Sequence, residues 1–223
     1  MKNCLFILLV FINTTLFSQT ITKNPGEFTS VKVFDQISVQ LIPGKESKVE
    51  IKGTRASEVE LVNKNEELKI RMKFSKLLQG ESIEVTVYYQ KLESVEANEG
   101  SYVNSETPIK GINFSLNAKE GAEIKIALNV QRASVKLNSG GKIKLTGNTD
   151  NQEVVITSGG ELKASNFISK QTTVSVSAGG EASIYAIDFV DAKVKAGGEI
   201  YIYGSPKQIN QKTVIGGTIK EMN

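Results

Sequence analysis

The chain has 223 residues, of which 39% are hydrophobic, enough apolar material for a sizeable core. Its 27 Lys and Arg residues nearly balance 24 Asp and Glu residues, so the basic surface that nucleic-acid binding requires is not expected. The sequence contains no histidine and no tryptophan. Imidazole-based acid–base catalysis, Ser-His and Cys-His nucleophilic pairs and the usual histidine ligands of transition metals are therefore excluded.

The first 19 residues have the pattern of a secretory signal peptide. A charged residue, Lys2, precedes an apolar run over 5–12, and polar residues follow up to Gln19. An apolar run of about 8 residues is too short to cross a bilayer core of about 30 Å as a helix. The single cysteine, Cys4, lies in this segment, so the mature chain is expected to carry no thiol, no disulfide, no transmembrane segment and no cofactor. We expect an exported protein of the periplasm, the outer-membrane surface or the extracellular space.

Residues 20–92 show strand alternation without a repeat. The pattern begins with Val31, Val33, Ile37, Val39 and Leu41. It continues in four short apolar segments: 49–51, 59–61, 68–72 and 83–87. We predict that these strands cap the first turn of the structure that follows and protect its edge from self-association.

Residues 93–223 repeat with a period of about 19 residues. Seven corner glycines are separated by 21, 19, 19, 20, 18 and 19 positions, and five of them begin Gly-Gly pairs. Glycine suits a tight corner because it reaches positive φ without steric cost. The seven glycines are Gly100, Gly121, Gly140, Gly159, Gly179, Gly197 and Gly216.

Apolar residues keep fixed distances from each corner glycine. They lie five and three positions before it and three and five positions after it, as Val135, Leu137, Ile143 and Leu145 do around Gly140. Spacing by two is strand alternation with one inward face, and units that cannot bury this face alone must stack. The sequence therefore predicts an all-β fold, a parallel β-solenoid. Antiparallel hairpins with glycine turns are the alternative, but they give no reason for a constant period.

The repeat also predicts details of individual turns. Each turn also has a less regular stretch away from its glycine corner, such as 166–170 or 188–190. In these stretches Ile168 and Phe189 are expected to face inward. In the final turn Gln211 and Thr213 replace aliphatic residues at inward positions, as expected where the stack ends and meets water.

The repeated Ser-Gly-Gly and Ala-Gly-Gly corners, preceded by the strand-like segments 34–41 and 49–53, resemble the putative auto-transporter adhesin head GIN domain family. The resemblance extends from about Phe28 to Gly217. It implies a right-handed parallel β-helix similar in shape to pectate lyases, found in exported proteins of Gram-negative envelopes. It also implies a role in adhesion and carries no catalytic residue onto this sequence.

Three tyrosines form one candidate binding surface. Tyr185, Tyr201 and Tyr203 fall on outward positions of adjacent turns, and the period places Tyr185 directly beneath Tyr203. Exposed aromatic rings on a sheet stack against sugars or anchor a protein partner. Tyrosine is also a good strand former, so the alternative that these residues serve only the sheet stays open.

Two charged columns are the other candidates. Two positions after the corner glycine, three consecutive turns carry a glutamate: Glu161, Glu181 and Glu199. Carboxylates about 5 Å apart repel one another, so this column is either a calcium site or a solvated polar edge, and we favour the edge. Four positions after the glycine, three consecutive turns carry a lysine, and the last turn carries a fourth: Lys125, Lys144, Lys163 and Lys220. They either keep the sheet soluble or bind anionic glycans.

The sequence thus predicts a signal peptide over 1–19, a β-strand cap over 20–92 and solenoid repeats over 93–223. We expect a non-enzymatic envelope or cell-surface protein for adhesion or scaffolding, which binds a glycan or a protein through an outer sheet face. The alternative is a carbohydrate-active enzyme of the pectate-lyase type that uses carboxylates and calcium.

Overall fold

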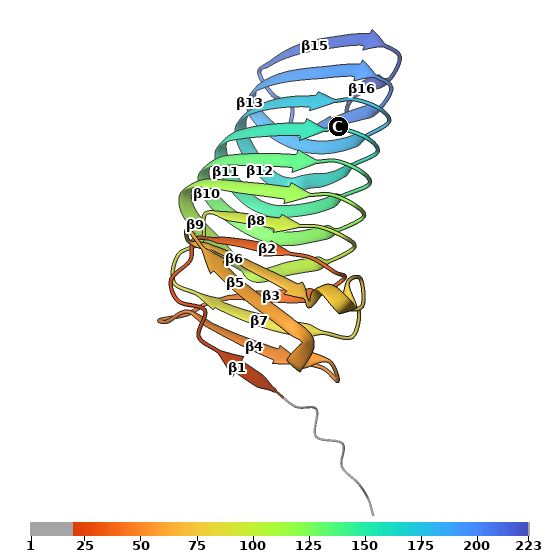
Figure 1. Ribbon diagram of the computed structural model, residues 1–223. Coiled ribbons are helices and arrows are strands. Elements are labelled where there is room, and N and C mark those ends of the chain that lie inside the picture. The colour runs from red at the N-terminus through yellow and green to blue at the C-terminus, as the bar shows by residue number, and fades with distance from the viewer. Residues whose placement is uncertain (1–19, 223) are drawn as a thin grey trace, which may run out of the picture.

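The repeats form consecutive turns of a β-solenoid, which confirms the predicted fold class (Figure 1). The computed structural model describes residues 20–222, and the expected signal peptide lies outside them. Each turn is a long bent strand that runs from one glycine corner to the next and pairs in parallel with its neighbours. Five such strands make up the middle of the stack: β9 (Tyr102–Ala118), β10 (Glu123–Leu137), β11 (Lys142–Ile156), β12 (Glu161–Val176) and β13 (Glu181–Ala196).

The apolar columns predicted from the corner offsets form the core. Ile143 on β11 lies between Ile124 and Leu162 of the adjacent turns, and all three side chains are buried. The prediction for the less regular stretch was wrong for Ile168, which is 45% exposed, whereas its neighbour Phe167 is buried. The cause is a register shift after Ala164, where β12 carries one more residue than β11 and the alternation changes face. The prediction was also wrong for Phe189, which is partly exposed and is the register partner of the exposed Gln171, whereas the next residue, Val190, is buried. Between Ala186 and Phe189, β13 carries one more residue than β12, so the alternation changes face there as well.

The two glycines of the corner at 140 and 141 serve different purposes. The first, Gly140, has a φ of 74°, and Ser139 before it has a φ of 49°, so both lie in the left-handed region. Gly141 does not need positive φ, but a Cβ atom there would lie 2.1 Å from the carbonyl oxygen of Ala118. The second glycine is therefore required by close packing between adjacent turns. Backbone hydrogen bonds continue through the corner, where the Gly140 N–H donates to the Ser158 carbonyl at 3.1 Å.

Two turns of the stack come from residues 20–92, and they are not in chain order. Strand β2 (Ser30–Val33) pairs in parallel with β8 (Ser94–Ala97), and β3 (Ser38–Pro43) pairs in parallel with β9. The two strands therefore add a further turn to the solenoid, built from residues before 93. Strands β6 (Glu67–Met72) and β7 (Glu84–Tyr89) pair in parallel with the other edges of β2 and β3. The hydrogen-bonded stack thus crosses residue 92 without a break. Whether residues 20–92 fold as a separate unit stays a prediction.

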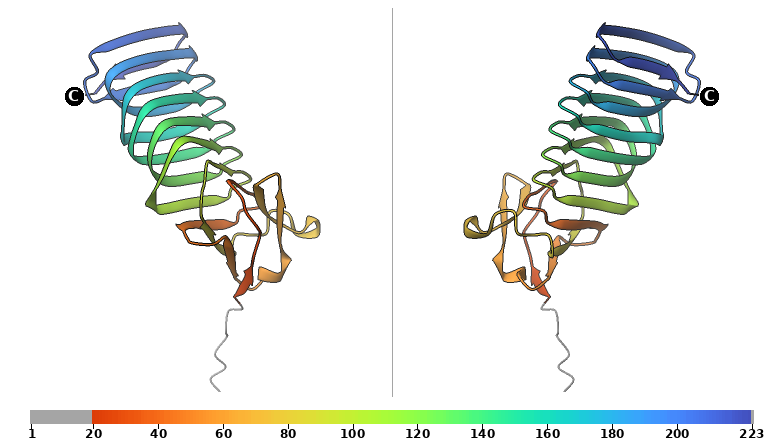
Figure 2. Two further views of the ribbon diagram at one scale, coloured as in Figure 1. Left: turned by 90° about the vertical axis from the view of Figure 1, so that its left-hand side faces the viewer. Right: turned by 90° about the vertical axis from the view of Figure 1, so that its right-hand side faces the viewer.

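The N-terminal end of the stack is closed by antiparallel strands (Figure 2). Strand β4 (Lys48–Lys52) pairs with β7, β1 (Ile21–Lys23) pairs with β4, and β5 (Val59–Lys64) pairs with β6. Two short 3-10 helices, Ala56–Glu58 and Phe74–Lys76, lie in the connections. The outer edges of β6 and β7 are therefore paired instead of exposed, while the cap over residues 20–92 stays a prediction.

The buried carboxylate of Asp35 ties the cap to the first corner. It accepts hydrogen bonds from the backbone N–H groups of Met72 at 2.9 Å and Leu78 at 2.8 Å. At the opposite end the stack finishes with β14 (Glu199–Tyr203), β15 (Gln208–Ile215) and β16 (Thr218–Glu221). Gln211 and Thr213 are exposed there, as the sequence predicts for the last turn.

Candidate binding surfaces

The structure brings the three predicted tyrosines together on the outside of the last turns. Tyr185 on β13 is the direct register partner of Tyr203 on β14, and Tyr201 lies two residues before Tyr203 on the same strand. All three side chains are partly exposed. Gly204 has no side chain where a Cβ atom would lie 2.5 Å from the Tyr185 ring, so this ring packs against backbone. We refer to Tyr185, Tyr201 and Tyr203 as the tyrosine face.

Tyr201 is held in place by charged neighbours. Its hydroxyl donates a hydrogen bond to the Glu199 carboxylate, and the Lys220 ammonium lies 5.7 Å from its ring centre. The hydrogen bond to Glu199 is the main reason why the pKa of Tyr201 is raised to about 12. The hydroxyl hydrogen of Tyr201 is therefore already used in the contact with Glu199.

This pKa gives a direct test of the tyrosine face. The sequence contains 6 tyrosines, and in an ultraviolet titration of the folded protein one phenol should ionise near pH 12 instead of near the usual value of about 10. Because the folded-state pKa is the higher one, the stability from this contact is fully present below about pH 10. It is lost as the pH rises through about 12. The variant Tyr201→Phe should lack the late transition, and an unchanged titration curve would contradict the contact.

The acidic column has the predicted register. Glu161, Glu181 and Glu199 are consecutive partners on β12, β13 and β14. The Glu161 carboxylate pairs with Lys163 at 2.7 Å, and Glu199 accepts the hydrogen bond from Tyr201. Within residues 20–222, no three acidic, Cys or His side chains come together in a group that could hold a metal ion. Two of the three carboxylates are engaged by the protein itself, which favours the solvated edge over the calcium site.

The lysine column is also in register. Lys125, Lys144 and Lys163 are successive partners on β10, β11 and β12, and their side chains are exposed. The pKa of Lys163 is raised, first by its hydrogen bond to Glu161. Anionic glycan binding by this column stays a prediction.

A groove that the sequence analysis missed lies on another outer face of the solenoid. It has a volume of about 770 Å³ and is lined by residues of successive turns. Two outward columns form it. The first stands eight positions before each corner glycine, and its members are register partners: Asn113, Arg132, Asn151, Gln171 and Phe189. The second stands six positions before it: Ser94, Ser115, Ser134, Glu153 and Thr173. The same offsets that located the core would have located these columns.

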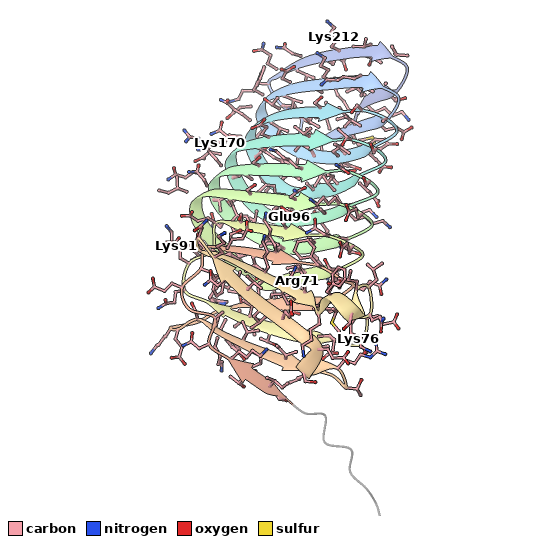
Figure 3. All side chains as sticks on the ribbon, viewed as in Figure 1. Arg71, Lys76, Lys91, Glu96, Lys170 and Lys212 are labelled. Carbon is pink, nitrogen blue, oxygen red and sulfur yellow. The ribbon has the colours of Figure 1, made fainter. Side chains whose placement is uncertain are left out.

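The groove has few charged residues, and its floor is formed by Phe114, Ala133 and Gln152. Its charged side chains are Arg132, Glu93 and Glu153, and Glu93 pairs at 2.6 Å with Lys91, which Figure 3 labels. The floor includes Gln152, which occupies an inward position and is only 2% exposed. Its Oε1 accepts a hydrogen bond from Thr172 Oγ1 at 3.2 Å, whereas its Nε2 has no hydrogen-bond partner among the described residues.

No helix within residues 20–222 has the length and apolar character needed to span a membrane.

Comparisons with known proteins agree with this architecture. A family model described as putative auto-transporter adhesin, head GIN domain, matches residues 27–206. The crystal structure of a putative adhesin from Bacteroides fragilis NCTC 9343 superposes with a TM-score of 0.86 at 20% identity, covering 93% of this chain and 98% of that one. A putative adhesin from Parabacteroides distasonis ATCC 8503 gives a TM-score of 0.76 at 20% identity, with 92% and 96% covered. No curated protein matches the sequence. At these identities the structural likeness shows the fold alone.

Proposed function

Because the chain belongs to the putative auto-transporter adhesin head GIN domain family, we propose that it is an exported, non-enzymatic adhesion protein. Its target, a glycan or a protein at a cell surface, is held on the outer face of the solenoid. The observation that carries this proposal is the tyrosine face, where Tyr185 and Tyr203 are stacked register partners beside Tyr201. Rings fixed on a hydrogen-bonded stack lose little conformational entropy when a partner covers them.

The competing function is a carbohydrate-active enzyme. Two carboxylates, Glu93 and Glu153, line the groove, and a pair of carboxylates is the usual machinery of glycoside hydrolysis. Incubation with a polysaccharide panel, with and without calcium, separates the two functions. An adhesin binds without releasing product, whereas new reducing ends or unsaturated ends would show an enzyme and overturn the non-enzymatic proposal.

Replacing all three tyrosines of the tyrosine face with serine is expected to weaken the binding of cells, and of any glycan that this face holds, while the fold persists. Their side chains lie on the outside, so the stability lost should be about 1 kcal/mol each, from cross-strand packing. Binding to whole cells and to a glycan array, together with circular dichroism, provides the measurement.

The matched control is Tyr88→Ser. Tyr88 is a partly exposed ring in the cap whose neighbour Lys48 lies 4.2 Å from the ring centre. It should bind targets as the unaltered protein does. Full binding by the triple variant would overturn the tyrosine face as the adhesive surface, and severe unfolding of that variant would contradict its outward placement.

A further inference from the structure

We infer that the groove is a second binding site, separate from the tyrosine face, and that it takes a neutral oligosaccharide chain lying along the solenoid axis. Its volume of about 770 Å³ falls within the range of about 300–1,000 Å³ that is typical of small-molecule sites. The residues that line it come mainly from the five strands β9–β13. With neighbouring strands about 4.8 Å apart, those five turns extend over about 19 Å. An elongated ligand therefore fits better than a compact one.

The first column supplies the hydrogen-bonding groups that hydroxyl-rich ligands need. Asn113, Asn151 and Gln171 carry carboxamides, each of which donates and accepts, and Arg132 between them donates. Sugar hydroxyls also donate and accept, so one amide matches two neighbouring hydroxyls. At the end of the column Phe189 provides an apolar ring against which the face of a sugar can pack.

The charges favour a neutral chain over a polyanion. One arginine and two glutamates line the groove, and the lysine that pairs with Glu93 engages that acid. A sulfated or uronic-acid polymer would place repeated negative charges beside Glu153 with only Arg132 to offset them.

An extended peptide is a poorer match. Strands β10, β11 and β12 have paired neighbours on both sides, so their backbone groups are already used between turns. A peptide lying along the axis would therefore find no free strand edge and would lose the main-chain hydrogen bonds that β-augmentation supplies.

The test is calorimetric titration of the protein with neutral oligosaccharides of dimer to hexamer length, with polygalacturonate as the anionic probe. We expect binding to at least one neutral series, with an affinity that rises with chain length. The double variant Asn151→Ala/Gln171→Ala should weaken that binding about tenfold or more. Both side chains are exposed, so circular dichroism should show an intact fold.

Two controls separate this site from the tyrosine face. Lys125→Ala/Lys144→Ala removes two outward side chains elsewhere on the same strands and should bind as the unaltered protein does. The triple tyrosine variant should also keep its oligosaccharide affinity. Absence of binding to every neutral oligosaccharide, preference for polygalacturonate, or unchanged affinity in the groove variant would each overturn the inference. Loss of affinity only in the tyrosine variant would overturn it too, while it would support adhesion through the tyrosine face.

Discussion

Replacement of Ile143 with aspartate is expected to destabilise the protein by several kcal/mol. Ile143 is 1% exposed and lies between Ile124 and Leu162 in the column three positions after the corner glycine. A carboxylate there would enter the core without a cation or hydrogen-bond donor to pair with it. Urea unfolding followed by circular dichroism measures the change.

The neighbouring residue gives the matched control. Lys144 is exposed on the opposite side of the strand, and Lys144→Asp introduces the same carboxylate one position along the chain. Its unfolding free energy should stay within about 0.5 kcal/mol of the unaltered protein. Equal losses in the two variants would show that the inward and outward assignment is wrong.

The second large effect is expected at a corner, where the two glycines should respond differently to alanine. Gly141→Ala places a Cβ atom 2.1 Å from the Ala118 carbonyl oxygen, so two backbone segments must separate. We expect a loss of about 3 kcal/mol or more. Gly140→Ala meets no atom within 4 Å and only adopts an unfavourable φ, so its loss should be about 1–2 kcal/mol.

Asparagine sharpens this comparison because it tolerates the left-handed region better than alanine. Gly140→Asn should therefore recover part of the stability lost in Gly140→Ala, whereas Gly141→Asn should be at least as damaging as Gly141→Ala. Thermal unfolding of the four variants is the measurement. A larger loss at Gly140 than at Gly141 would contradict the separate roles of the two glycines.

The solenoid could be predicted from the sequence because its inward columns stand at constant offsets from the glycines. The two turns within residues 20–92 could not be found in this way, because Asp35 and Gln36 take the left-handed conformations of their corner without glycine. Counted from Gln36, the residues five and three positions before it and three and five after it are all buried: Val31, Val33, Val39 and Leu41. The spatial order of those turns also depends on contacts between segments far apart in the chain.

The candidate surfaces were predictable to different degrees. Tyr185 and Tyr203 occupy the same offset of adjacent repeats, so their pairing follows from the period alone. The groove was harder to predict, because it forms where the bent strands leave a hollow between two outward columns. The residue types in those columns also vary from turn to turn. Ile168 was misplaced because one extra residue in β12 changes the face on which the following side chains lie.

Because the turns stack uniformly, the length of the groove depends on the number of turns. One 19-residue unit brings its own corner, its own inward residues and its own pair of groove residues, and its strands pair with the turn before and the turn after. Duplication of a unit would lengthen the groove by about 4.8 Å without disturbing the rest, and deletion would shorten it by the same step. If the groove holds an oligosaccharide as we infer, the length of chain that it accommodates would change in steps of one whole turn, independently of the side chains that each turn presents.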